Sequence, residues 1–197
     1  MIITKIKISK FNQIMLYSGE DYIISLPPEV FKKSGLKVGS EITQEDINNI
    51  NLISQEHKAK EKALNILSYR AHSKNELKNK IKSRFGEQCA QNIVDKIENL
   101  GLINDEKFAE DYALELIKNK YYSLKRVKFE LIKKNISSEI INNILKNLDI
   151  DEHENLIKIV NKRNFLDLKD QKDITRAVNY LYRLGYDLEQ IKNALNI

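Results

Sequence analysis

The sequence lacks the residues on which most metal and disulfide sites depend. Its 197 residues include one cysteine and three histidines, and His57, His72 and His153 lie far apart in the chain. No HExxH motif and no paired-cysteine spacing occurs, so the sequence predicts no metal site. The single Cys89 cannot form an internal disulfide, which favours a reducing compartment and predicts a cytoplasmic protein with a structural thiol.

Glycine, proline and long apolar runs are also scarce. None of the six glycines stands in a GxxxxGK or GxGxxG arrangement, so we expect no phosphate-binding loop and no cofactor. Both prolines, Pro27 and Pro28, lie in the first fifth of the chain, which leaves the remainder free to be helical. No stretch reaches the roughly 18 consecutive apolar residues that a membrane span needs. The first ten residues contain no signal-peptide apolar block, and we expect no membrane partner.

The N-terminal segment has the period of a β-sheet. Residues 4–9 alternate between polar and apolar side chains, and the β-rich runs 13–17 and 22–26 flank a polar turn that contains Gly19. The two prolines end the second run and begin a short helix that closes near Gly35. This pattern predicts a small β-hairpin-containing segment over residues 1–45.

From residue 43 onward the apolar period is about 3.6, and groups of three short helices recur. The second and third groups are offset by 50 residues, which aligns Leu131 with Leu181 and Asn135 with Gly185. Asn and Gly both tolerate the positive φ that closes many helices. Fixed-period similarity is typical of stacked repeats, with an irregular helical bundle as the alternative. We predict a mainly α protein in which three tandem three-helix repeats form an elongated, curved array, over residues 46–103, 104–150 and 151–197.

The net charge of +5 is divided into blocks that follow the repeats. Residues 70–86, 118–134 and 158–183 carry net charges of +5, +6 and +4, whereas residues 87–117 and 135–157 carry −6 and −4. The basic blocks coincide with the second helix of each repeat. Any one of them is explained equally well as a solvated helix surface. Three blocks in register favour a surface that faces a polyanion.

Helical geometry predicts which of these side chains point outward. At 100° per residue, Val127 and Leu131 define an inward face, which places Arg126 and Lys133 almost opposite. Phe129 falls on the same outer half, where its ring is available to stack on a base or to enter a protein groove. The alternative for Phe129 is packing against the neighbouring repeat. The candidate binding residues are Arg70, Lys74, Lys78, Lys82, Lys125, Arg126, Phe129, Lys133, Arg176 and Arg183.

Two motifs at helix boundaries resemble those of a known family. Residues 70–77 match the pattern R-x-x-S-x-x-E-L, and residues 101–109 match G-L-I-D-D-x-x-F-A except that Asn104 replaces the first Asp. These motifs resemble the RecX family of bacterial recombination regulators, over roughly residues 57–197. The residues themselves favour structural roles, because Ser73 and Glu76 suit a helix cap and Gly101 a helix end.

The resemblance implies a regulator without catalytic activity that binds RecA and lodges in the groove of the RecA filament on single-stranded DNA. There it would mostly inhibit strand exchange, ATP hydrolysis and co-protease activity, and so act in homologous recombination, DNA repair and the SOS response. We expect a monomer. Direct binding of single-stranded DNA remains open.

Two other classes of protein remain as alternatives. Residues 23–42 faintly resemble the hairpin unit of AbrB-type dimers, which would make the chain a DNA-binding transcription regulator. A nuclease would need clustered carboxylates to hold metal ions, and the acidic residues of this chain are dispersed.

Overall fold

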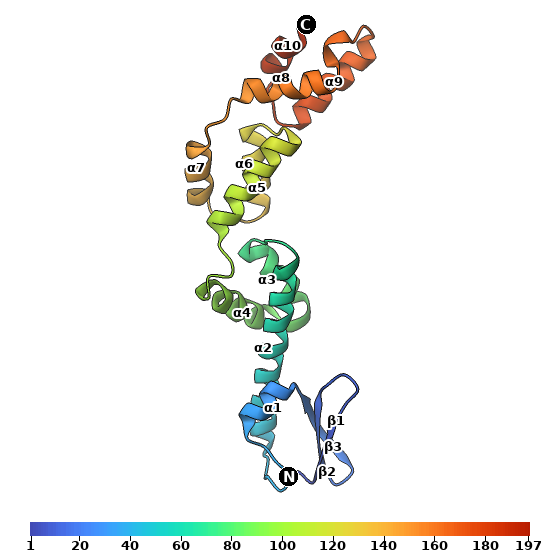
Figure 1. Cartoon of the computed structure of the whole chain (residues 1–197), viewed down its shortest axis with the longest axis vertical. Coiled ribbons are helices and arrows are strands. Elements are labelled where there is room, and N and C mark those ends of the chain that lie inside the picture. Colours follow the sequence, from blue (N-terminus) through green and yellow to red (C-terminus); the bar gives the residue numbers. More distant parts are fainter. The chain divides into compact units, whose positions relative to one another are not determined.

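The computed structural model describes all residues, 1–197, and the chain divides into two compact units. The first unit comprises residues 1–72 and 76–102, and the second comprises residues 73–75 and 103–197. Ten α-helices and one three-stranded sheet account for the regular structure (Figure 1). None of the helices is both long enough and apolar enough to cross a membrane.

The first unit begins with an antiparallel sheet. Strands β1 (Lys5–Ile8), β2 (Ile14–Ser18) and β3 (Asp21–Leu26) pair in the order β1-β2-β3, which confirms the predicted hairpin. Helix α1 (Pro28–Ser34) follows, and Gly35 closes it with a φ of 68°. The sheet, α1 and the start of the next helix share an apolar core, and Figure 1 shows α1 and the strands in the same part of the chain.

Helix α2 (Gln44–Tyr69) is longer than the sequence predicted. The side chain of Thr43 accepts a hydrogen bond from the backbone N–H of Asp46, and the Asp46 carboxylate accepts one from Thr43 in return. Its first half belongs to the core of the sheet through Ile47 and Ile50, whereas buried Ala63 lies in its second half. The prediction that the first helix of this repeat is short is therefore wrong. No glycine or proline interrupts residues 44–69, so one helix serves both the sheet and the first repeat.

Helices α3 (Lys74–Phe85) and α4 (Glu87–Asn99) complete the first repeat. Gly86, with a φ of 84°, separates them. At the end of α4, Gly101 has a φ of 69° and the Leu102 N–H donates to the Ile97 carbonyl, a bond that satisfies an otherwise orphaned helix-end acceptor. The side chains of Leu77, Ile81, Ile93 and Ile97 are buried in this repeat.

The second unit contains the two later repeats. One consists of α5 (Asp105–Lys120), α6 (Leu124–Lys133) and α7 (Ser138–Asn147). The other consists of α8 (Glu152–Lys162), the 3₁₀ turn η1 (Phe165–Asp167), α9 (Gln171–Arg183) and α10 (Leu188–Leu195). Leu131 and Leu181 are both fully buried, and Asn135 and Gly185 both have positive φ. The mainly helical fold and its 50-residue period are thus confirmed, whereas the four segment boundaries stay predictions.

Hydrogen bonds join the two repeats of the second unit at the N-terminus of α6. The Ser123 N–H donates to the Leu184 carbonyl over 3.0 Å, and the Tyr186 hydroxyl donates to the Tyr121 carbonyl over 3.0 Å. The Glu152 carboxylate accepts from the Leu124 N–H at 2.6 Å. These bonds satisfy backbone groups that a helix end leaves unpaired. They fix the turn between α9 and α10 against the start of α6.

Candidate partner-binding surface

A hollow of about 390 Å³ lies between α6 and the turn that joins α9 to α10. Four predicted binding residues surround it, namely Lys125, Arg126, Phe129 and Arg183, together with Tyr182, Gly185 and Tyr186. We call it the cationic cavity. The structure therefore brings candidates from two repeats to one place.

Gly185 is the residue that allows this approach. Its φ is 99°, and a Cβ atom added there would overlap the Ser123 hydroxyl oxygen and lie 2.7 Å from the Cβ of Arg126. Any larger residue would push the turn away from α6. The equivalence of Asn135 and Gly185 in the sequence revealed the positive φ, but not this close contact.

Arg126 is more enclosed than the sequence predicted. Its guanidinium carbon lies 5.5 Å from the centre of the Tyr122 ring and 5.3 Å from that of Phe129, and its Nη2 lies 2.7 Å from Glu130 Oε1. Only 32% of its side chain is exposed. Cation–π contacts with two rings hold the guanidinium in one place. Its buried Nε has no hydrogen-bond partner.

Phe129 lies on the outer side of α6, as the helical geometry predicted. Its side chain is 48% exposed, and the Lys133 ammonium lies 4.4 Å from the ring centre. Lys133 also lies 3.4 Å from Glu130 Oε1. Its ring forms a platform between two cations, and it also lines the cationic cavity beside Tyr182 and Tyr186 of the third repeat. Packing against the neighbouring repeat therefore stays an alternative.

The cations of the third repeat differ from one another in their partners. Arg176 Nη1 lies 2.8 Å from Asp173 Oδ1, whereas exposed Arg183 has no ion pair. Lys125 reaches across to Asp187 at 3.0 Å, and this hydrogen bond raises the pKa of the lysine above its ordinary value. Arg183 is thus the cavity cation most available to a partner.

In the first unit, the candidate cations face nearby carboxylates. Lys78 and Lys82 each lie 2.6 Å from one oxygen of Glu87, and their hydrogen bonds lower the pKa of Glu87 to about 2. Arg70 lies 3.2 Å from Glu76. Lys74 belongs to the second unit, where its backbone N–H donates to Asp105 Oδ1 at 2.8 Å; this bond does not involve its ammonium group.

Local carboxylates partly neutralise the candidate cations. Most of the candidate cations are paired, because the few acidic residues among them lie one helical turn away or at the next helix start. Exposed pairs of this kind contribute only about 0–1 kcal/mol each, so a phosphate or a partner's carboxylate can replace the local one at little cost. A continuous stripe over all three repeats stays a prediction.

The sequence reasoning missed three members of this surface. Tyr182 and Tyr186 line the cationic cavity, and Glu130 organises Arg126 and Lys133. Glu130 is the only acidic residue in the block 118–134, which was a visible signal. For Tyr186, whose pKa is raised by burial, the signal was its position directly after Gly185.

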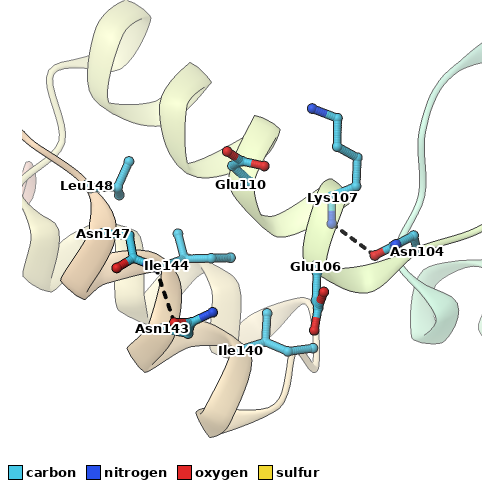
Figure 2. A pocket seen from close by; sticks show the side chains of 9 residues that line it. All are labelled: Asn104, Glu106, Lys107, Glu110, Ile140, Asn143, Ile144, Asn147 and Leu148. Carbon is cyan, nitrogen blue, oxygen red and sulfur yellow. Dashed lines mark hydrogen bonds between the residues drawn. The ribbon is translucent and has the colours of Figure 1, made fainter.

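A second hollow of about 350 Å³ lies between α5 and α7 and has a different character. Figure 2 shows that Glu106, Lys107 and Glu110 approach it from α5, opposite Ile140 and Ile144 of α7. Its polar groups are engaged locally: Asn104 accepts from the Lys107 N–H at 3.0 Å, and Asn147 donates to Asn143 at 3.2 Å (Figure 2). It has no aromatic ring in its lining, and its charged side chains are two carboxylates and one lysine.

No group of three or more His, Cys, Asp or Glu side chains is placed to hold a metal ion. Cys89 is half-buried in α4, and burial raises the pKa of its thiol. A raised pKa disfavours the reactive thiolate.

The fold and this surface define a class of protein, namely a three-helix repeat protein whose second helices carry cations and exposed rings. Models of the first and second three-helix domains of RecX match residues 59–96 and 104–145. The chain belongs to the RecX family. Its resemblance to that family, inferred from two motifs, is confirmed.

Two relatives and one solved structure match nearly the whole chain, and a second solved structure matches 72% of it. The regulatory protein RecX of Clostridioides difficile is 32% identical over 99% of this chain and 94% of its own length. That of Caldanaerobacter subterraneus subsp. tengcongensis is 28% identical over the full length of both. A crystal structure of regulatory protein RecX covers 99% of this chain and 98% of its own with a TM-score of 0.70 at 20% identity. RecX from Lactobacillus salivarius covers 72% of this chain and 95% of its own with a TM-score of 0.58 at 24% identity. At these identities the two structures support the fold alone, whereas the relatives indicate a regulatory role.

Proposed function

We propose that this protein binds RecA and the RecA filament on single-stranded DNA, and that it regulates the filament, mostly by inhibition, without catalytic turnover. Membership of the RecX family supports a regulatory role. The observation that carries the proposal is the cationic cavity, where Lys125, Arg126 and Arg183 surround Phe129. Three cations around a half-exposed ring suit an acidic protein groove or a nucleic acid backbone.

The ion pairs indicate how such a surface engages a filament. Lys125 and Arg126 are held by Asp187 and Glu130 in the free protein. On binding, phosphates or partner carboxylates replace these carboxylates, so the interaction weakens as salt is added. Arg183 needs no such exchange, because it has no ion pair to break.

The test is a titration of RecA-dependent ATP hydrolysis on single-stranded DNA with the wild type and a Lys125→Gln/Arg183→Gln variant. We expect the wild type to inhibit at less than one molecule per RecA, and the variant to need roughly ten times more protein. Replacing Arg126 and Lys133 by Glu would be less informative, since it would place two further carboxylates beside Glu130.

Lys128→Gln is the matched control for this titration. Lys128 is exposed on the same helix, one turn from Lys125, but does not line the cationic cavity. The Lys128→Gln variant should inhibit ATP hydrolysis as strongly as the wild type. Equal inhibition by all three proteins would remove the cavity from the proposal, and no inhibition by the wild type with its cognate RecA would remove the function.

A further inference from the structure

A larger hollow in the second unit, of about 680 Å³, combines aromatic rings and cations without any carboxylate in its lining. Tyr121, Tyr122, Phe165 and Tyr180 contribute rings, and Lys120, Lys162 and Arg163 contribute positive charge. We call it the aromatic cavity. None of these residues belongs to the binding surface predicted from the sequence.

The cations of the aromatic cavity rest on its rings rather than on acidic side chains. The Arg163 guanidinium carbon lies 4.3 Å from the centre of the Tyr180 ring, and the Lys162 ammonium lies 5.0 Å from that of Tyr121. Phe165 meets Tyr180 edge to face at 5.9 Å. Rings and a stacked guanidinium are flat surfaces on which nucleobases stack, and the neighbouring cations suit the attached phosphates.

The backbone at Tyr121 is a second, independent observation. Five residues other than glycine have positive φ; four are asparagines, which tolerate this region, and the fifth is Tyr121 with a φ of 57°. This φ closes α5, and because a bulky side chain is strained there, the surrounding structure must hold it in place. Hydrogen bonds pin the strained residue, since its N–H donates to the Ile117 carbonyl and its own carbonyl accepts from Tyr186. The result is a ring held at the wall of the cavity.

The aromatic cavity adjoins the cationic cavity at Tyr122. The Tyr122 ring lines the former and lies 5.5 Å from the guanidinium carbon of Arg126, which lines the latter. Two neighbouring hollows, each with rings and cations, suit consecutive nucleotides of one strand.

We propose that the aromatic cavity binds an unpaired nucleobase of a single-stranded nucleic acid, stacked on Tyr121 and on the Arg163 guanidinium that lies over Tyr180, with a flanking phosphate on Lys162. A base inside a duplex cannot enter, because its faces are covered by its neighbours. The inference goes beyond regulation of RecA, since binding of this kind requires no recombinase.

The test measures anisotropy of a fluorescein-labelled oligothymidylate of about 16 nucleotides, in the absence of RecA, against an abasic strand of the same length. The two probes carry the same phosphates and differ only in their bases. We expect the wild type to bind the oligothymidylate at least about fivefold more tightly than the abasic strand. Equal affinity for both probes, or no binding of either at low salt, would overturn the proposal.

Variants assign the binding to the cavity. Tyr180→Leu keeps apolar packing but removes the ring, and should reduce the affinity for oligothymidylate to that for the abasic strand. Arg163→Gln changes no ion pair and should weaken binding about threefold to tenfold. Unchanged affinity in both variants would overturn the assignment. If these variants bound both probes like the wild type but lost their effect on RecA, the cavity would face a protein, which also overturns it.

Lysine substitutions on one helix provide the matched control. Lys162→Gln removes a cavity charge, whereas Lys158→Gln removes an equal charge one turn earlier on α8, outside the cavity. We expect the first to weaken binding of both probes and the second to leave it nearly unchanged; equal weakening would contradict a local site. Far-ultraviolet circular dichroism and thermal midpoints establish that each variant is folded.

Displacement of the oligothymidylate by AMP at equal nucleotide concentration would assign the cavity to a free nucleotide instead, and would overturn binding of a strand.

Discussion

The second and third repeats share one scaffold but hold their outward cations differently. Lys133 and Arg183 occupy equivalent positions, 50 residues apart. Lys133 lies beside Glu130, whereas Arg183 has no carboxylate partner. Arg183 has no such partner because the third repeat has Tyr180 at the position equivalent to Glu130. Tyr180 lines the aromatic cavity.

Their closing turns are held alike but differ in how closely they approach the neighbouring helix. The turn at Asn135 accepts a hydrogen bond from the Ser73 hydroxyl, and the turn at Gly185 accepts one from the Ser123 N–H, each over 3.0 Å. Asn135 and Gly185 both have positive φ, but a Cβ atom at Gly185 would overlap Ser123, whereas Asn135 already carries an exposed side chain. The buried positions and the joints thus repeat, while the surfaces diverge. Binding is to be sought where the repeats differ.

The largest expected effect comes from exchanging the residues of these turns. Gly185→Asn should lower the free energy of unfolding by about 3 kcal/mol, because the new side chain meets Ser123 and Arg126. Asn135→Gly should change it by no more than about 0.5 kcal/mol. Urea denaturation of both variants measures the difference. Similar values for the two would show that the turns are equivalent after all.

The sequence predicted the scaffold well because helix signals are local. A helix begins or ends because of a few neighbouring residues. Examples are the cap at Thr43 and the glycines at 35, 86 and 101, which lie at helix ends. The single failure, the length of α2, arose because a helix can serve two cores without a stop signal between them.

The candidate surface was less predictable because it depends on contacts between repeats. Helical geometry placed Phe129 and Lys133 outward correctly. It could not show that Arg126 is enclosed between two rings, since Tyr122 precedes the helix. Nor could it find the aromatic cavity, whose walls come from three separate helix ends.

Loss of the Tyr186 hydroxyl should have the next largest effect. Tyr186→Phe leaves the Tyr121 carbonyl without its partner and should lower the free energy of unfolding by about 1 kcal/mol. The equivalent residue of the second repeat, Ile136, has no hydroxyl to lose. Chemical denaturation at neutral pH tests this, and an unchanged midpoint would mean that the hydroxyl is dispensable to the joint.

The same variant should alter the alkaline branch of the stability profile. Burial raises the pKa of Tyr186 in the folded state, so the folded protein keeps a proton that the unfolded chain releases. Stability is therefore fully present below the unfolded pKa of about 10 and is lost as pH rises above it. The free energy of unfolding of Tyr186→Phe should therefore fall less steeply with pH in this range than that of the wild type.

A smaller effect is expected from releasing the cations of the second repeat. Glu130→Gln frees Arg126 and Lys133 and should change stability by no more than about 1 kcal/mol. If both cations then bind phosphates, the plot of log K against log salt concentration for oligothymidylate becomes steeper. Its slope becomes more negative by about 0.7 for each added phosphate contact. Asp173→Asn frees Arg176, which does not line either cavity, and should leave the salt dependence nearly unchanged. Equal slopes for the wild type and Glu130→Gln would show that the freed cations do not face nucleic acid.

The smallest effect extends the comparison to the first repeat, where Glu87 holds Lys78 and Lys82. Their hydrogen bonds lower the pKa of Glu87 to about 2, whereas Glu139, which also begins a third helix, has no ion pair. Because the folded pKa is depressed, the stability that Glu87 contributes is present above its unfolded value near 4.5 and is lost as pH falls through about 2. Carboxyl-detected NMR titration should find the pKa of Glu87 well below the ordinary glutamate value of 4.5, with the difference narrowing in high salt because Glu87 and Lys82 are exposed. If the pKa of Glu87 were near 4.5, the lysines of α3 would be as free for a partner as Arg183 is in the third repeat.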